Sequence, residues 1–199
     1  MMSVIAAGFS DPVLGAQIGF RTVMEAIARP GSVRALPGLP AAPPPLSPVA
    51  AAIALTLTDY DTPIWLDGPL AAVEEVTAWL RFHTGAPVID DPARAAFAFL
   101  AEPAQAPPFS AFALGTPEYP DRSTTLVMQM ERLSGGPALT LAGPGIVGSQ
   151  ELSAAPLPPD IATRLAANRA LFPRGVDLLM VSADAVMALP RSTRVTAGG

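Results

Sequence analysis

The chain has 199 residues, a formal net charge of −5 and no cysteine. Proteins that bind nucleic acid need a positive field to displace counterions, so the net charge argues against that class. Without cysteine the chain cannot form disulfides, iron–sulfur sites or a thiolate nucleophile. It also has no lysine, which excludes a Schiff base with pyridoxal phosphate and the lysine of a Walker A loop. The single histidine, His83, leaves too few nitrogen ligands for a conventional zinc site.

Charged residues are scarce: they make up 15% of the chain, whereas typical soluble proteins contain about 25%. A monomer must cover its surface with polar groups, so this shortage favours a surface that is buried against partner subunits. A general bias of the sequence toward alanine and proline would explain the same composition. Composition alone does not choose between the two.

The expected location follows from two stretches of sequence. The first twelve residues lack the basic flank of a signal peptide. The longest nearly apolar run, residues 48–57, is shorter than the roughly 20 residues that a membrane-spanning helix needs. We therefore expect a soluble, cytoplasmic protein that does not enter a membrane.

The first half of the chain is expected to begin with two helices. Asp11 and Pro12 are typical of a helix start, and the Arg-Pro-Gly sequence at 29–31 is typical of a helix end. Residues 35–48 are so rich in proline that we expect a surface loop. Ser47, followed by proline, predicts a second helix through residue 58. The apolar face of the first helix is predicted from Val13, Leu14, Ile18, Val23, Met24 and Ile27.

Strands and further helices then alternate. Residues 62–66 and 95–100 are predicted strands, and Pro69 opens a third predicted helix that Gly85 closes. A second proline-containing loop is expected at 101–110.

The second half predicts two hairpins around a last helix. Residues 124–130 and 138–142 alternate like strands and are expected to pair across the glycine turn at 134–136. Pro159 opens the final predicted helix, and strands at 177–182 and 185–189 are expected to pair. This interleaving predicts an α/β fold, with one domain over residues 1–199 and a mixed β-sheet flanked by helices.

The sequence GPGIVG at 143–148 follows the predicted strand at 138–142 and matches the glycine pattern of dinucleotide-binding loops. Such a loop needs a helix directly after it, whose amino end holds the pyrophosphate. Here the next residues have no helical period and soon reach three prolines, and Pro144 removes a backbone donor. We interpret Gly143 and Gly145 as residues that permit a tight turn.

Six blocks of the sequence, in order and at compatible spacing, resemble one family. The segment LSGGPALTLAGPGI at 133–146 resembles a signature of the H subunit of the bacterial carbon–phosphorus lyase core complex. The other blocks are FRTVMEAIARPG (20–31), LTLTDYDTPIWL (55–66), LRFHTGAPV (80–88), GTPEYPDRSTTLV (115–127) and FPRGVDLLMVSADAVMALPRSTRV (172–195). Together they span nearly the whole chain, and the two proline-rich loops match least.

The resemblance implies a fold similar to the large domain of pyridoxal-phosphate-dependent transferases, but without that cofactor or any other. It implies a homodimer that joins the G, I and J types of subunit in the core complex. One of these subunits is implied to cleave the carbon–phosphorus bond by radical chemistry with S-adenosylmethionine and an iron–sulfur cluster. The resemblance also implies a link to the transfer of ribose triphosphate from ATP to a phosphonate, the reaction of a ribose 1-methylphosphonate 5-triphosphate synthase.

Three residues are candidates for an anion site. Arg81 could direct two donors at a phosphate or phosphonate oxygen, and His83 could shuttle a proton. Alternatively, His83 caps the last carbonyls of its helix and Arg81 pairs with a carboxylate. Arg191 follows the last predicted strand beside Ser192, and either binds an anion or forms an ion pair at a subunit interface.

Two carboxylates, Asp59 and Asp61, flank Tyr60 in a predicted turn and are weak candidates for a metal site. They would equally well accept hydrogen bonds from turn amides.

Two hypotheses for the function follow. In the first, the chain is a non-catalytic homodimeric subunit that organises the assembly. In the second, it is an enzyme component in which Arg81, His83 and Arg191 meet in one pocket.

Overall fold

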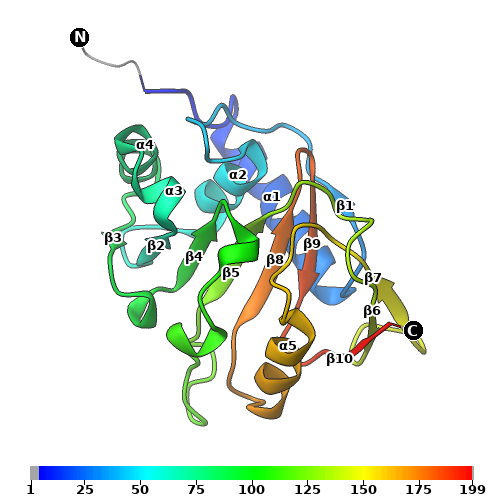
Figure 1. The fold of residues 1–199 in the computed structure, drawn as a ribbon. Helices are drawn as coiled ribbons and strands as arrows, with labels where there is room; N and C mark the ends of the chain where they lie inside the picture. Colours follow the sequence, from blue (N-terminus) through cyan, green and yellow to red (C-terminus); the bar gives the residue numbers. More distant parts are fainter. Residues whose placement is uncertain (1–4, 199) are drawn as a thin grey trace.

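The computed structural model describes residues 5–198, which are built around a sheet of seven strands (Figure 1). In their order across the sheet, the strands are β1 (Arg34–Ala35), β9 (Ala185–Leu189), β8 (Asp177–Val181), β5 (Thr125–Gln129), β4 (Phe97–Leu100), β2 (Ile64–Leu66) and β3 (Val88–Ile89). Strands β8, β5, β4, β2 and β3 run parallel to one another, whereas β9 is antiparallel to both β8 and β1. The predicted α/β class and mixed sheet are confirmed.

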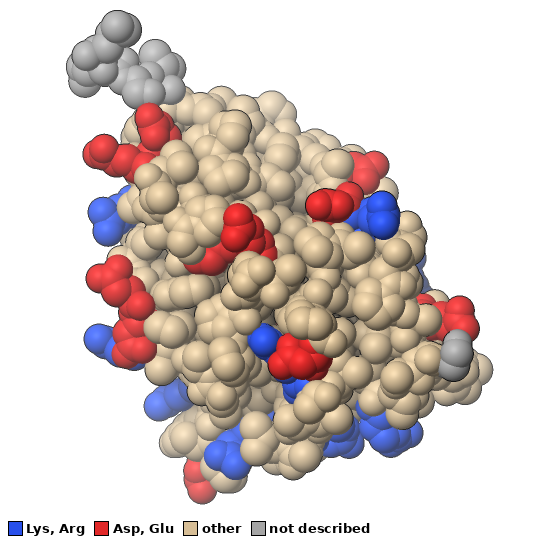
Figure 2. All heavy atoms as spheres, in the orientation of Figure 1, with Lys and Arg blue, Asp and Glu red and all other residues tan. Residues whose placement is uncertain are grey.

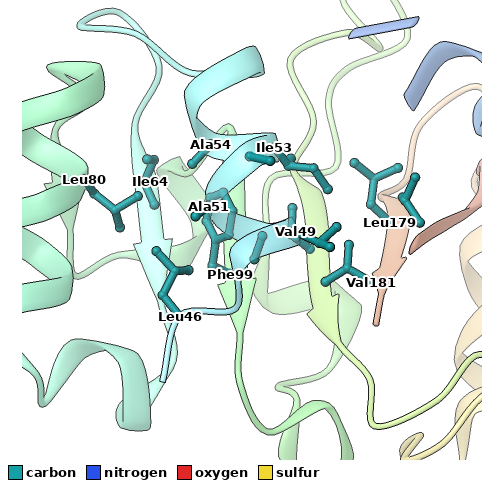
Figure 3. Close-up of a cluster of buried hydrophobic side chains, with 14 of the residues drawn as sticks. Leu46, Val49, Ala51, Ile53, Ala54, Ile64, Leu80, Phe99, Leu179 and Val181 are labelled. Atoms are coloured by element: carbon teal, nitrogen blue, oxygen red, sulfur yellow. The ribbon is translucent and has the colours of Figure 1, made fainter. Parts of the chain in front are cut away.

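One face of this sheet is covered by α1 (Pro12–Ala28), α2 (Pro48–Leu57), the short α3 (Gly68–Ala71) and α4 (Glu74–Thr84). The centre of this layer is α2, whose residues 49–54 are all buried. Val49 and Ile53 reach from α2 toward Phe99 of β4 and Leu179 of β8 (Figure 3). Burying an aliphatic or aromatic side chain of this size contributes about 1.5–3 kcal/mol, so this cluster stabilises the sheet strongly.

The other face is covered by α5 (Ile161–Ala170) and by a second sheet with the order β10 (Arg194–Ala197), β6 (Leu139–Ala142) and β7 (Gln150–Leu152). Short 3₁₀ turns at Pro103–Gln105 and Phe109–Ala111 complete this layer. Side chains along β5 alternate between the layers: Val127 packs toward α2, while Leu126 and Met128 pack toward the second sheet. The central strands are thus buried on both faces, as parallel strands require.

Both helix starts predicted in the first half are confirmed. The carboxylate of Asp11 accepts a hydrogen bond from Leu14 N at 3.0 Å, and the hydroxyl of Ser47 accepts one from Ala50 N at 3.2 Å. Each cap is followed by a proline in the first turn, where the missing N–H costs nothing. The predicted end of the third helix is also confirmed, because Gly85 adopts φ +72°.

The third predicted helix is instead two helices. The chain leaves the helical path at Val73, which has φ −104° and ψ 105°, between α3 and α4. Leu70 and Val76 are both fully buried, on opposite sides of this break. The break lets the two short helices each direct an apolar side chain into the core, and helix propensity alone does not reveal it.

The hairpin predicted between residues 124–130 and 138–142 is wrong. Strand β5 is flanked by β4 and β8 as parallel neighbours, so neither edge is free for β6. Strand β6 belongs to the second sheet, where it pairs antiparallel with β10 and β7. The second predicted hairpin, between β8 and β9, is confirmed.

The glycine-rich segment at 143–148 is followed by the strand β7, so the helix that a dinucleotide loop needs is not there. Gly145 has φ +79°, and an added Cβ would lie 2.1 Å from the carbonyl oxygen of Ala28. The positive φ of Gly145 agrees with the turn interpreted from the sequence, whereas the close packing of the loop against the end of α1 was not predicted.

The surface carries charge sparsely. On the face shown in Figure 2, acidic and basic side chains are scattered, and wide areas between them carry none. Among residues 5–198, the helices are all too short or too polar to cross a membrane.

Candidate functional site

Arg81 and His83 lie near the end of α4. The Nε2 atom of His83 donates a hydrogen bond of 2.9 Å to the carbonyl oxygen of Ala6, which Trp79 Nε1 also reaches at 2.9 Å. The imidazole packs against the Trp79 ring at 4.6 Å between centroids. His83 thus joins α4 to the amino-terminal segment rather than capping its own helix. Arg81 is exposed, and no carboxylate of residues 5–198 forms an ion pair with it.

Asp59 and Asp61 lie in the turn between α2 and β2. The Oδ1 atom of Asp59 accepts hydrogen bonds from Asp61 N at 3.0 Å and from Thr62 Oγ1 at 2.7 Å. This geometry is an Asx turn, in which the carboxylate takes the place of a backbone carbonyl. In the part of the chain that the structure describes, no three acidic or histidine side chains come together as a metal site would need.

Arg191 follows β9 at the edge of the sheet where β5 and β8 begin. Its Nε lies 3.1 Å from each carboxylate oxygen of Asp177, and Nη2 also contacts that carboxylate. Nη1 donates to Pro120 O at 2.6 Å and Nη2 donates to Ser123 Oγ at 2.5 Å. The guanidinium therefore ties together the start of β8, the end of β9 and the 120–123 loop.

The three residues of the predicted anion site do not line one hollow. Arg191 borders an open hollow of about 440 Å³ together with Ile27 and Phe172, and neither Arg81 nor His83 lines it. The donors of Arg191 are directed at protein acceptors. Anion binding by these residues stays a prediction. In the structure, His83 attaches α4 to the amino-terminal segment, and Arg191 joins the ends of two strands to the 120–123 loop.

Sequence reasoning missed two polar residues at the opposite edge of the sheet, where parallel strands end and α/β proteins commonly bind ligands. Gln129, at the end of β5, accepts a hydrogen bond from Ser47 N at 2.7 Å and donates one to Pro45 O at 2.9 Å. It thereby holds the proline-rich loop, predicted to be a surface feature, over this edge. The loop also contributes Leu46 to the core.

Asp67 is the second residue that was missed. It follows β2, and its carboxylate accepts hydrogen bonds from Leu70 N at 3.4 Å and from Glu102 N at 2.9 Å. Its side chain caps α3 and joins the ends of β2 and β4. Burial raises the pKa of the Asp67 carboxyl above its ordinary value of 3.8, although the N–H groups that donate to it act in the opposite direction. Asp before Gly-Pro, directly after a buried strand, is the signal that could have identified this cap.

We expect this buried carboxyl to make stability depend on pH. Because its pKa is higher in the folded than in the unfolded chain, its contribution is fully present below 3.8 and is lost as pH rises through the folded-state pKa. Denaturant unfolding of the wild type and of Asp67→Asn, measured from about pH 4 to about pH 7, isolates this contribution. The stability of the wild type relative to the variant should fall as pH rises; an increase would show that the ionised form is favoured.

The most unusual surface feature is α1. Val13, Leu14, Phe20 and Met24 are all exposed on it, although the opposite side of the helix is packed against α2 and β9. The apolar residues predicted to form one face therefore occupy two, and only Val23 is fully buried, with Ile18 partly so. Large exposed apolar patches usually mark sites of protein association.

Comparison with known proteins identifies the family. The sequence profile of the bacterial phosphonate metabolism protein family (PhnH) matches residues 7–196. The chain belongs to this family. A PhnH-family relative from Rhizobium meliloti (strain 1021), the alpha-D-ribose 1-methylphosphonate 5-triphosphate synthase subunit PhnH, is 45% identical over 192 residues, which is 96% of each chain. A shorter match, 40% identical over 86 residues, covers 43% of this chain and 44% of the putative C-P lyase subunit protein HtxG from Stutzerimonas stutzeri.

The blocks of sequence by which the chain resembles the PhnH family meet in the structure. The block at 115–127 contributes Pro120 and Ser123, and the block at 172–195 contributes Asp177 and Arg191, to a single hydrogen-bonded cluster. The block at 133–146 packs against the end of the first block through Gly145 and Ala28. The shared blocks thus hold the strands and α1 in place.

Proposed function

We propose that this chain is a subunit of the enzyme that transfers ribose triphosphate from ATP to a phosphonate in the carbon–phosphorus lyase pathway, and that it acts in the cytoplasm, where ATP is present. The observation that carries the proposal is the 45% identity to the Rhizobium meliloti synthase subunit over 96% of both chains. At this identity and coverage the two chains share their fold.

Within that enzyme, the chain acts as a non-catalytic, homodimeric subunit that organises the G, I and J types of subunit. Three contacts support this role, because in each a candidate site residue already has a partner within the chain. His83 donates a hydrogen bond to Ala6 O, the Asp59 carboxylate accepts one from Asp61 N, and Arg191 is hydrogen-bonded to the Asp177 carboxylate. Gln129 holds a loop over the edge of the sheet where a ligand would be expected. The exposed apolar side of α1 offers a surface for assembly.

The fold is further proposed to be that of the large domain of pyridoxal-phosphate-dependent transferases, without the cofactor. The parallel strands covered by helices are compatible with that architecture. The chain has no lysine with which pyridoxal phosphate could form a Schiff base. The scaffold would thus be retained for shape and contact rather than for cofactor chemistry.

A reconstitution experiment tests the proposal. The purified chain alone, given ATP and methylphosphonate, should form no ribose-triphosphate product, whereas the other subunits should co-purify with it and should lose transfer activity when it is omitted. Product formed by the chain alone would contradict the organising role. Failure to co-purify with any subunit, together with full activity in its absence, would contradict membership of the assembly.

Calorimetry with the same two ligands tests the second candidate function, a subunit with its own anion site. The exposed Arg81, which has no ion-pair partner within residues 5–198, is the observation that favours it. Binding heat that disappears in Arg81→Ala and His83→Ala, but persists in the exposed control Arg94→Ala, would support a phosphonate or triphosphate site. Absence of heat in the wild type supports the organising role.

A further inference from the structure

The exposed side of α1 has the spacing of a coiled-coil seam. Residues 13, 17, 20, 24 and 27 follow one another at intervals of four, three, four and three, which places them in one stripe along the helix. The apolar members are exposed to an extent unusual for such side chains: Val13 69%, Phe20 54%, Met24 46% and Ile27 36%. Gln17 is the only polar residue in the stripe. We call these five residues the α1 stripe.

The opposite side of α1 is already used. Gly19, Val23 and Ala26 are buried, and a Cβ at Gly19 would lie 2.4 Å from Thr56 Oγ1 of α2. The helix therefore cannot turn to hide the stripe inside its own chain. A helix that is apolar on both sides belongs in the interior of a larger body, so the α1 stripe is expected to be covered by another chain.

Two hollows adjoin the exposed side of α1. The first, of about 820 Å³, is lined by Ala16, Gln17, Phe20, Arg21, Met24, Glu25, Ala28 and Thr56. The second, of about 450 Å³, is lined by Leu14, Gln17, Ile18, Arg21, Thr22, Glu25 and Pro37. Gln17, Arg21 and Glu25 line both hollows, and a row of side chains bordered by hollows is a shape against which a second helix can pack.

We propose that the α1 stripe pairs with α1 of a second copy of this chain, with the two helices antiparallel about a two-fold axis near residues 22 and 23. In such an isologous contact every pair of residues occurs twice, once on each side of the axis. An axis at this position sets Phe20 against Met24 of the partner subunit and brings Arg21 close to Glu25 of the partner subunit. The inference rests on the proposed function, to whose homodimer it assigns an interface.

The charged residues beside the α1 stripe favour a second copy of this chain over a different partner. Arg21 and Glu25 both line the two hollows, one turn apart, so the surface beside the stripe carries one positive and one negative group. A partner of a single charge sign would leave one of them facing a like charge. The antiparallel copy satisfies both.

The apolar surface extends past the helix. Ile27 at the end of the stripe also lines the hollow of about 440 Å³ that contains Phe172, whose side chain is exposed. A helix of 17 residues is only about 25 Å long, so a stable dimer needs contact area beyond the helix pair. The surface around Phe172 supplies it.

The test measures the molar mass of the purified chain by light scattering or sedimentation over a range of concentrations. The wild type should be a dimer, and Phe20→Glu should raise the dimer dissociation constant by about 100-fold or more. The matched control is Phe82→Glu, which makes the same change at an exposed phenylalanine of α4 and should leave the dimer intact. Because both side chains are exposed, circular dichroism should show both variants folded.

Charge reversal tests the antiparallel arrangement. Arg21→Glu alone, or Glu25→Arg alone, places like charges opposite each other and should weaken the dimer about tenfold. The double variant Arg21→Glu/Glu25→Arg should restore wild-type dimerisation, because every pair across the axis is again of opposite sign. Failure of the double variant to restore the dimer would overturn this arrangement.

The outcomes of these experiments separate this inference from the proposed function. A Phe20→Glu variant that remains a dimer overturns the α1 pairing and leaves the proposed function intact. A monomeric wild type overturns the α1 pairing together with the homodimeric part of the proposed function, whereas membership of the assembly is tested separately by reconstitution. If the monomeric wild type co-purifies with another subunit and Phe20→Glu abolishes that contact, α1 binds a different subunit and the second copy is ruled out. Loss of reconstitution with an intact α1-dependent dimer would contradict only the proposed function.

Discussion

Replacing Arg191 by alanine is expected to lower the free energy of unfolding by about 3 kcal/mol. The guanidinium is 14% exposed and its partner carboxylate on Asp177 is 28% exposed, so the pair is shielded from water on most sides. Removing the side chain takes the guanidinium donors away from that carboxylate, Pro120 O and Ser123 Oγ, and leaves the carboxylate with the backbone N–H of residue 191 at 2.8 Å. Urea unfolding of the wild type and the variant, followed by circular dichroism, measures the difference.

Arg194→Ala is the control for this experiment. Arg194 lies three residues further on, is exposed and has no ion pair within the described residues, so its loss should change stability by less than about 0.5 kcal/mol. Arg191→Lys should recover only part of the loss, because an ammonium group cannot reach the carboxylate, Pro120 O and Ser123 Oγ together. Equal stability of the Arg191→Ala variant and the wild type would mean that the cluster is not what holds the 120–123 loop.

Local signals were sufficient for the helix starts. The side chains of Asp11 and Ser47 accept a hydrogen bond from a free backbone N–H in the first turn of the helix. The proline that follows each of them lies where no N–H is needed, so these local residues define the helix start. The same holds for Gly85, whose positive φ ends α4. These features were predictable because their physical cause lies within three or four residues.

Pairing between strands was predictable only where the connection is short. Strands β8 and β9 are joined by a tight turn and pair with each other, whereas β5 and β6 alternate equally well yet lie in different sheets. Strand β5 is flanked by β4 and β8, and the latter lies about fifty residues further on. An alternating pattern states which side chains face the core, but not which neighbour completes the hydrogen bonds.

The candidate site was predictable as a set of residue types but not as an arrangement. The sequence left Arg191 with two alternatives, an anion site or an ion pair at a subunit interface, and the pair with Asp177 of the same chain was not among them because only the fold brings Asp177 and Ser123 to it. The local cap by Asp67 could have been predicted, but its bond to Glu102 N, 35 residues away, could not. For α1, the sequence supplied the apolar residues of both sides, but the side that faces outward is decided by where α2 and β9 lie.

A substitution in the glycine-rich segment at 143–148 is expected to have the second large effect on the free energy of unfolding. Gly145→Ala is expected to cost about 3 kcal/mol, because the new Cβ would lie 2.1 Å from the carbonyl oxygen of Ala28 and the residue has φ +79°. Gly148→Ala is a matched control: φ is +70° and no heavy atom lies within 4 Å, so only the conformational cost of about 1 kcal/mol applies. Denaturant unfolding of both variants therefore separates close packing from backbone strain. Equal losses would mean that the loop does not pack against the end of α1, and that its glycines serve the turn alone.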